Sequence, residues 1–182
     1  MVYKTILIFF ALINIALGNI IYDKNNTIVT QIEMDESALL PQHYVTDNVE
    51  RLNLYRKIAK ANTIEEIKDW RSEVEDRFGP FPSDATRLWQ CKILQYYASN
   101  LYFVKITLRV GKMWCMCPKI ESALGRSYYE APLFTNILNH IKKVTGDSHS
   151  IIQKDDAIRF LFEKVNNLSD AIDLLKKIYE SQ

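Results

Sequence analysis

The sequence predicts an α+β fold, in which three N-terminal helices are followed by an antiparallel sheet of two hairpins with two further helices. Apolar residues recur with the 3.6-residue period of a helix in the first half of the chain. In the second half they alternate with polar residues, as they do in a half-buried strand. Short turn signals join the expected strands in pairs, and strands that tight turns connect are antiparallel. Grouped hairpins and segregated helices are typical of α+β domains.

The composition indicates one globular domain with a modest appendix. Of the 182 residues, 48% are apolar, which is enough for a hydrophobic core. The 23 basic and 22 acidic residues give a formal charge of +1, so no single-sign field is available to hold a polyanion. We therefore expect no direct contact with nucleic acid. The basic residues of the first predicted helix are interpreted as a solvated face; they are Arg51, Arg56, Lys57 and Lys60.

Residues 1–26 form an apolar leader, and residues 27–182 form the predicted domain. Lys4 precedes an apolar run from Ile6 to Leu17, and the small residues around Gly18 suit a signal peptidase. The run is shorter than the about 20 apolar residues that cross a membrane. The leader is therefore signal-like, anchor-like or the product of a spurious start. Three cysteines, an odd number without framework spacing, favour the reduced cytoplasm over export.

Capping signals delimit the three N-terminal helices. A short extended piece, Ile28–Ile32, precedes them. Capping-box patterns that start at Asp47 and Thr63 open the first two helices. The second helix ends at Gly79, and the prolines beyond it reinforce the stop. Ser83 caps the third helix, whose wide apolar arc predicts a central position under the sheet.

Two hairpins and two helices are predicted for the rest of the chain. One face of Phe103–Val110 is apolar and the other is polar, which indicates a strand with one buried face. Gly111-Lys112 marks the turn into the next strand. The remaining elements are the strand Met113–Cys117, a helix opened by Pro132, the strands Ser150–Lys154 and Ala157–Lys164 around Asp155-Asp156, and a helix capped by Ser169.

No motif for a cofactor, a metal or catalysis stands out. The five glycines are scattered, so there is no glycine-rich phosphate loop, and we expect no cofactor and no small-molecule substrate. Cys115 and Cys117, with His140 and His149, form the most metal-like set. Their spacing fits zinc poorly, and packing on the core side of a strand is the simpler interpretation. A thiol nucleophile at Cys91 or Cys117 would need a positioned base, which no pattern indicates.

Three ordered motifs lie in the first half of the predicted domain. They are Leu40-Pro41-Gln42-His43-Tyr44-Val45, then Glu50-Arg51-Leu52 with Leu54-Tyr55-Arg56-Lys57-Ile58-Ala59, and finally Glu73-Val74-Glu75-Asp76-Arg77-Phe78-Gly79 with Pro82. In this order and spacing, they closely resemble the start of the last domain of transcription-repair coupling factors (Mfd). Weaker similarity continues to the C-terminus, so the resemblance covers roughly residues 28–182.

The resemblance implies a regulatory docking domain in transcription-coupled nucleotide-excision repair. An intact coupling factor is a large cytoplasmic bacterial ATPase that binds stalled RNA polymerase and recruits UvrA and UvrB. Its last domain carries none of the motor motifs, packs against a UvrB-like module and masks the UvrA-binding surface. For this chain, the resemblance implies a protein that is not an enzyme. Its implied partners are the UvrB-like module and the motor domains, on a separate chain if present, with indirect links to UvrA and RNA polymerase.

The resemblance also indicates a partner-binding site at the acidic end of the second helix. The matching positions are Glu73, Asp76 and Arg77. Glu73 and Asp76 are three residues apart and so lie on one helical face. Acidic residues near a helix C-terminus oppose the helix dipole, and an external cationic partner would offset that cost. The alternative is that Asp76 and Arg77 only pair with neighbours at the surface, and the sequence leaves both interpretations open.

Two departures from the family pattern keep other functions open. This sequence has no counterpart of the upstream family domains. The family, in turn, has no counterpart of the leader. The chain is then either a functional half of a split protein or the truncated remnant of a broken gene. The main alternative is an exported or membrane-tethered α+β binding protein, held through residues 4–18. A third interpretation is a small hydrolase that uses Cys91 or Cys117.

Overall fold

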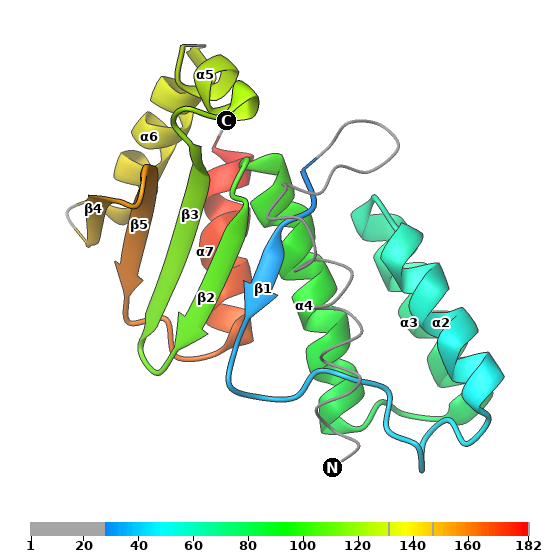
Figure 1. The fold of residues 1–182 in the computed structure, drawn as a ribbon. Helices are drawn as coiled ribbons and strands as arrows, with labels where there is room; N and C mark the ends of the chain where they lie inside the picture. The colour runs from blue at the N-terminus through cyan, green and yellow to red at the C-terminus, as the bar shows by residue number, and fades with distance from the viewer. Residues whose placement is uncertain (1–27, 131, 147, 182) are drawn as a thin grey trace.

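The computed structural model describes residues 28–130, 132–146 and 148–181, and it shows a sheet with helices on one side (Figure 1). The strands are β1 (Gln31–Glu33), β2 (Lys105–Arg109), β3 (Lys112–Lys119), β4 (His149–Lys154) and β5 (Ala157–Glu163). The helices are α2 (Asn48–Lys60), α3 (Ile64–Phe78), α4 (Ser83–Asn100), α5 (Ala123–Glu130), α6 (Pro132–Thr145) and α7 (Leu168–Glu180). The predicted α+β class is therefore confirmed.

The sheet has the strand order β1-β2-β3-β5-β4, and it is mixed rather than wholly antiparallel. Both predicted hairpins are present, since β2 pairs with β3 and β4 pairs with β5 in the antiparallel direction. The prediction of a sheet made of two hairpins alone was wrong, because β1 adds a fifth strand parallel to β2. This strand lies in the extended piece that precedes the helices. A parallel partner is reached through a long connection, so no turn signal marks it.

Thr30 anchors the segment that leads into β1. Its hydroxyl donates a hydrogen bond of 2.6 Å to the carbonyl oxygen of Phe103 and lies 3.0 Å from the hydroxyl of Ser99. Thr30 is fully buried, and a buried hydroxyl must be hydrogen-bonded to avoid a large desolvation cost. The threonine thus ties the start of β1 to α4 and to the segment that enters β2.

The prediction of two helices after the first hairpin was also wrong, because the structure has three. The additional helix is α5, which has only eight residues. Two helical turns are too short to establish a 3.6-residue apolar period in the sequence. Packing holds α5 in place: Tyr128 is buried, and its ring lies 5.4 Å from the ring of Phe134 on α6.

Helix α4 lies in the middle of the structure, as its wide apolar arc predicts. It packs against α7, α3 and β1. In Figure 1, α4 and α7 run behind the sheet, and the α2–α3 pair lies on the far side of α4. The helix-covered face of the sheet carries the core. Its buried residues, in register across β2, β3 and β5, are Ile106, Cys115 and Phe160, and then Leu108, Met113 and Phe162.

The predicted leader, residues 1–26, lies outside the described residues, so its separation from the domain stays a prediction. Within the part of the chain that the structure describes, no helix combines the length and the apolar character needed to cross a membrane.

Gly125 provides a test of the α5 packing. A Cβ at this position would collide with the backbone carbonyl of Lys119. The end of a flexible side chain could move aside, but a backbone atom cannot do so easily. We expect Gly125→Ala to lower the free energy of unfolding by about 2 kcal/mol or more, because the backbone must shift to make room. Urea unfolding of the full chain measures this difference. The control Ser127→Ala, at an exposed position of the same helix, should change stability by less than about 0.5 kcal/mol. Equal effects of the two variants would contradict the close approach.

Candidate docking surface on α2 and α3

The C-terminal end of α3 is held in a fixed position by its caps and its aromatic neighbours. Thr63 and Glu66 form the capping box that the sequence predicts at the N-terminal end. At the other end, Gly79 has a φ of 85°, which a residue with a side chain rarely adopts. The hydroxyl of Tyr44 donates a hydrogen bond of 2.5 Å to the Gly79 carbonyl. The loop before α2 therefore fixes the place where α3 ends.

Trp70 joins α3 to α2 from the buried side. Its side chain is 1% exposed, and its indole N–H donates a hydrogen bond of 3.1 Å to the Leu54 carbonyl. Phe81 lies edge-on to the indole at 5.7 Å between ring centroids. Since Ile67, Trp70 and Val74 take the buried stripe of α3, the predicted site residues are left on its other sides.

Glu73 and Arg77 belong to a charged cluster that bridges α2 and α3, which we define as Glu50, Lys57, Glu73 and Arg77. Lys57 of α2 is in direct contact with the Glu73 carboxylate. The Arg77 guanidinium lies 2.7 Å from Glu50 and 3.9 Å from Glu73. The two acids and two bases balance, so the cluster has no net charge. Its side chains are partly exposed, which limits each pair to about 1 kcal/mol or less.

Asp76 differs from the other two predicted site residues. It is exposed on the last turns of α3. Among the residues that the structure describes, no ion pair or hydrogen bond joins Asp76 to another side chain. The three predicted residues thus lie at one end of one helix, but two of them are neutralised internally and only Asp76 presents an uncompensated charge.

The basic residues of α2 are also partly engaged. One guanidinium nitrogen of Arg51 donates a hydrogen bond of 2.7 Å to the Val45 carbonyl, and Lys57 is held by Glu73. Beside the charged cluster lies a groove of about 360 Å³, to which Lys60 and Asp69 both contribute. Charges of both signs line this groove, so it has no evident preference for an anion or a cation.

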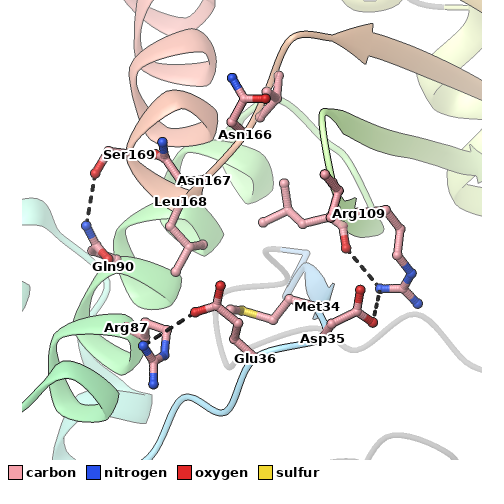
Figure 2. Close-up of a pocket in the computed structure, with 13 residues that line it drawn as sticks. Met34, Asp35, Glu36, Arg87, Gln90, Arg109, Asn166, Asn167, Leu168 and Ser169 are labelled. Carbon is pink, nitrogen blue, oxygen red and sulfur yellow. Dashed lines mark hydrogen bonds and ion pairs between the residues drawn. The ribbon is translucent and has the colours of Figure 1, made fainter.

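A second hollow lies where the N-terminal ends of α4 and α7 meet the β2–β3 turn (Figure 2). Its volume is about 250 Å³. The two arginines on its wall are paired: Arg87 lies 3.4 Å from Glu36, and Arg109 lies 3.3 Å from Asp35. Because these acids occupy the guanidinium groups, the hollow does not form an anion site.

The cysteines are buried in the way that the packing interpretation predicts for Cys115 and Cys117. Both point to the core and are fully buried. Burial raises the pKa of Cys117 to about 12 and that of Cys115 well above its ordinary value. Burial also raises the pKa of Cys91, to about 12. A raised thiol pKa is the opposite of what a nucleophilic cysteine needs. The described residues contain no group of three or more His, Cys, Asp or Glu side chains arranged to hold a metal ion.

Sequence reasoning missed the internal partners of the site, Glu50 and Lys57. Both lie on the preceding helix, and their pairing with α3 depends on how the two helices pack. The one usable signal was the surplus of basic residues on α2 opposite the acidic residues of α3, which favours pairing between the helices.

Comparison with known proteins identifies the class of domain. Residues 34–123 match the family model of the TRCF domain. A transcription-repair-coupling factor from Rickettsia bellii is 35% identical over 161 residues, which cover 84% of this chain and 13% of the relative. The corresponding protein of Borreliella burgdorferi is 26% identical over 141 residues, or 75% of this chain and 12% of the relative. The Escherichia coli protein is 34% identical over 77 residues, 42% of this chain and 7% of the relative. The chain therefore carries a TRCF domain.

A solved structure shares the fold of this chain. The crystal structure of the C-terminal domain of transcription-repair coupling factor matches with a TM-score of 0.64 and 17% identity. The match covers 84% of this chain and 95% of that chain, and it shows a shared fold. The chain is thus related to the C-terminal domain of transcription-repair coupling factors, as the sequence motifs predict. The matched regions span about an eighth or less of the length of the curated relatives named above.

The thiol environments can be tested by labelling the full chain with Ellman's reagent. At pH 8 we expect native labelling to be roughly a hundredfold slower than labelling in denaturant, because the raised pKa values keep the buried thiols protonated. A thiol whose pKa is higher in the folded than in the unfolded chain stabilises the fold while it is protonated. For Cys91 and Cys117, this contribution to the free energy of unfolding is complete below the ordinary thiol pKa of 9.0 and is lost as the pH rises toward 12. Rapid native labelling of Cys115 or Cys117 would contradict the burial of these two thiols.

Proposed function

We propose that this protein is a regulatory docking domain of transcription-coupled nucleotide-excision repair, without motor activity of its own. In this role it binds the remaining domains of a coupling factor through the C-terminal end of α3. It packs against a UvrB-like module, masks the UvrA-binding surface and releases that surface when the contact opens. The links to UvrA and RNA polymerase are then indirect. The relationship to the C-terminal domain of coupling factors supports this proposal.

The observation that carries the proposal is the uncompensated charge of Asp76 beside the neutral cluster. The cluster side chains hold each other in place through their ion pairs. At the C-terminal end of α3, an arriving partner therefore meets Asp76 as an exposed charge that no ion pair among the described residues compensates. A cationic side chain would offset both this charge and its unfavourable position against the dipole of α3. The contact would be modest in strength, because the residues are partly exposed, and a releasable contact has to be modest.

We also propose a cytoplasmic location. Three unpaired cysteines support it, since Cys91, Cys115 and Cys117 form no disulfide in the structure. The alternative is export through residues 4–18.

The docking proposal can be tested by a pull-down from native lysate of the source organism with the full chain as bait. We expect capture of a polypeptide that mass spectrometry identifies by its UvrB-like module or its motor. Asp76→Lys should reduce that capture about tenfold or more, because it would oppose a cation with a cation.

Asp173→Lys is the matched control, because it makes the same charge change at an exposed position of α7. It should leave capture unchanged. A reversal of Glu73 would be less specific, because it would also remove the ion pair with Lys57 and disturb the α2–α3 contact. If neither the wild type nor the control captures such a polypeptide, or if Asp76→Lys captures it equally well, the proposed site is wrong.

The location is tested by the intact mass of the protein isolated from its own cells. A cytoplasmic protein should retain residues 1–18, apart from processing of the initiator methionine. Loss of these residues by cleavage after Gly18 would support the exported binding protein instead.

A further inference from the structure

The open edge of β4 is the feature that the docking role leaves unused. β4 is the last strand of the sheet, and β5 is its neighbour on one side only. Its side chains are exposed from Ser150 to Lys154, so no described helix or loop covers them. The opposite edge is different, because β1 has only three residues and ends in the charged Glu33, which pairs with Lys105.

The usual protections of an edge strand are missing from β4. Natural sheets guard such edges with proline, a β-bulge, a charge in the middle of the strand or a very short strand. β4 has six residues, and its register with β5 runs without a shift from His149 to Lys154. Its only permanent charge is Lys154, at the end of the strand. Two adjacent isoleucines occupy the centre, with Ile151 49% and Ile152 38% exposed on opposite faces of the sheet.

The register shows which backbone groups face the open edge. Asp155 and Asp156 form a two-residue loop with φ values of 52° and 57°, as in a type I′ turn. The pair beside such a loop, Lys154 and Ala157, is a hydrogen-bonded pair, and hydrogen-bonded and non-hydrogen-bonded pairs then alternate along the ladder. Ser150, Ile152 and Lys154 therefore direct their backbone N–H and C=O groups toward β5. Consequently His149, Ile151 and Gln153 direct theirs outward.

We propose that β4 pairs with β4 of a second copy of this chain, in an antiparallel arrangement centred on Ile151. In this register Ile151 lies opposite its own symmetry mate, and His149 lies opposite Gln153. All three outward-facing residues then find a partner for both backbone groups. No pair in the register brings together two permanent like charges, since Lys154 lies opposite Ser148. In a register shifted by one residue and centred on Ile152, only Ile151 and Gln153 would pair through their outward-facing backbone groups.

The geometry also limits the assembly to two copies. The pairing is isologous, so each copy uses the same edge, and that edge is consumed. The edges left at the two ends of the joined sheet are the short, charged β1 strands. A single pair of six-residue strands buries less than the about 1,200 Å² of a standard interface, so the dimer should exchange quickly with monomer. A covalent trap is therefore the sharpest test.

The trap is Ile151→Cys in the full chain under mild oxidation with oxidised glutathione. Cα atoms of a hydrogen-bonded antiparallel pair are about 5.5 Å apart, which a disulfide can span. We expect at least ten times more disulfide-linked dimer from Ile151→Cys than from wild type, whose cysteines are buried or half-buried. The matched control is Ile152→Cys. Its symmetry mate lies diagonally, at roughly 7–8 Å, and should link poorly.

Sedimentation velocity in reducing buffer provides the second measurement. Wild type should shift from monomer toward dimer as its concentration rises, and Ile151→Pro should remain monomeric. Proline at this position removes an outward N–H and leaves the bonds to β5 intact, which circular dichroism can verify. Failure of Ile151→Cys to link above the level of Ile152→Cys would overturn the proposal. So would a dimer that persists unchanged in Ile151→Pro, as association through the leader would produce.

Discussion

The fold depends on α4 being buried on two sides at once. Apart from Ser83, none of its residues is fully exposed, although the helix has 18 residues. One side meets α7 and the sheet, and the other meets α3. Its own sequence explains this position, because small residues such as Ala98 let other elements approach closely while Leu94 and Tyr97 fill the space between them. A surface helix could not connect the α2–α3 pair to the sheet, so without α4 the two halves would share no core.

The charged cluster on α2 and α3 shows how an exposed surface can be ordered without being strongly stabilised. The buried indole of Trp70 sets the distance between the helices, and the ion pairs of Glu73 and Arg77 then fix the side chains that face solvent. Exposed pairs contribute little to the free energy of folding. Their effect is instead to reduce the side-chain freedom that a binding partner would otherwise have to remove. Pre-arranged side chains of this kind suit a contact that must form and open repeatedly.

Short sequence signals predict the elements whose structure depends on interactions between neighbouring residues. The capping box at Thr63, the stop at Gly79 and the loop at Asp155-Asp156 all lie where the sequence places them, because each depends on residues within four positions. The helix α5 is absent from the prediction because eight residues are too few to show a helical period, and its place depends on aromatic contacts of Tyr128 with Phe134 and with the more distant Tyr102. β1 is recognisable as extended, but its pairing is not, since nothing in a strand of three residues specifies a parallel partner. The same limit applies to the site: helical spacing puts Glu73 and Asp76 on one face, whereas the neutralisation of Glu73 depends on the packing of α2.

The parallel pairing of β1 with β2 has a consequence for how the chain folds. The hydrogen bond from Thr30 to Phe103 joins residues that are 73 positions apart in the sequence. All of α2, α3 and α4 lie within that closed loop. Closing a loop of this length costs chain entropy before any contact compensates for it, whereas the hairpins β2–β3 and β4–β5 close locally. The hairpins and α4 are therefore expected to form early, and β1 to join the sheet last, after the three helices have brought its two ends together.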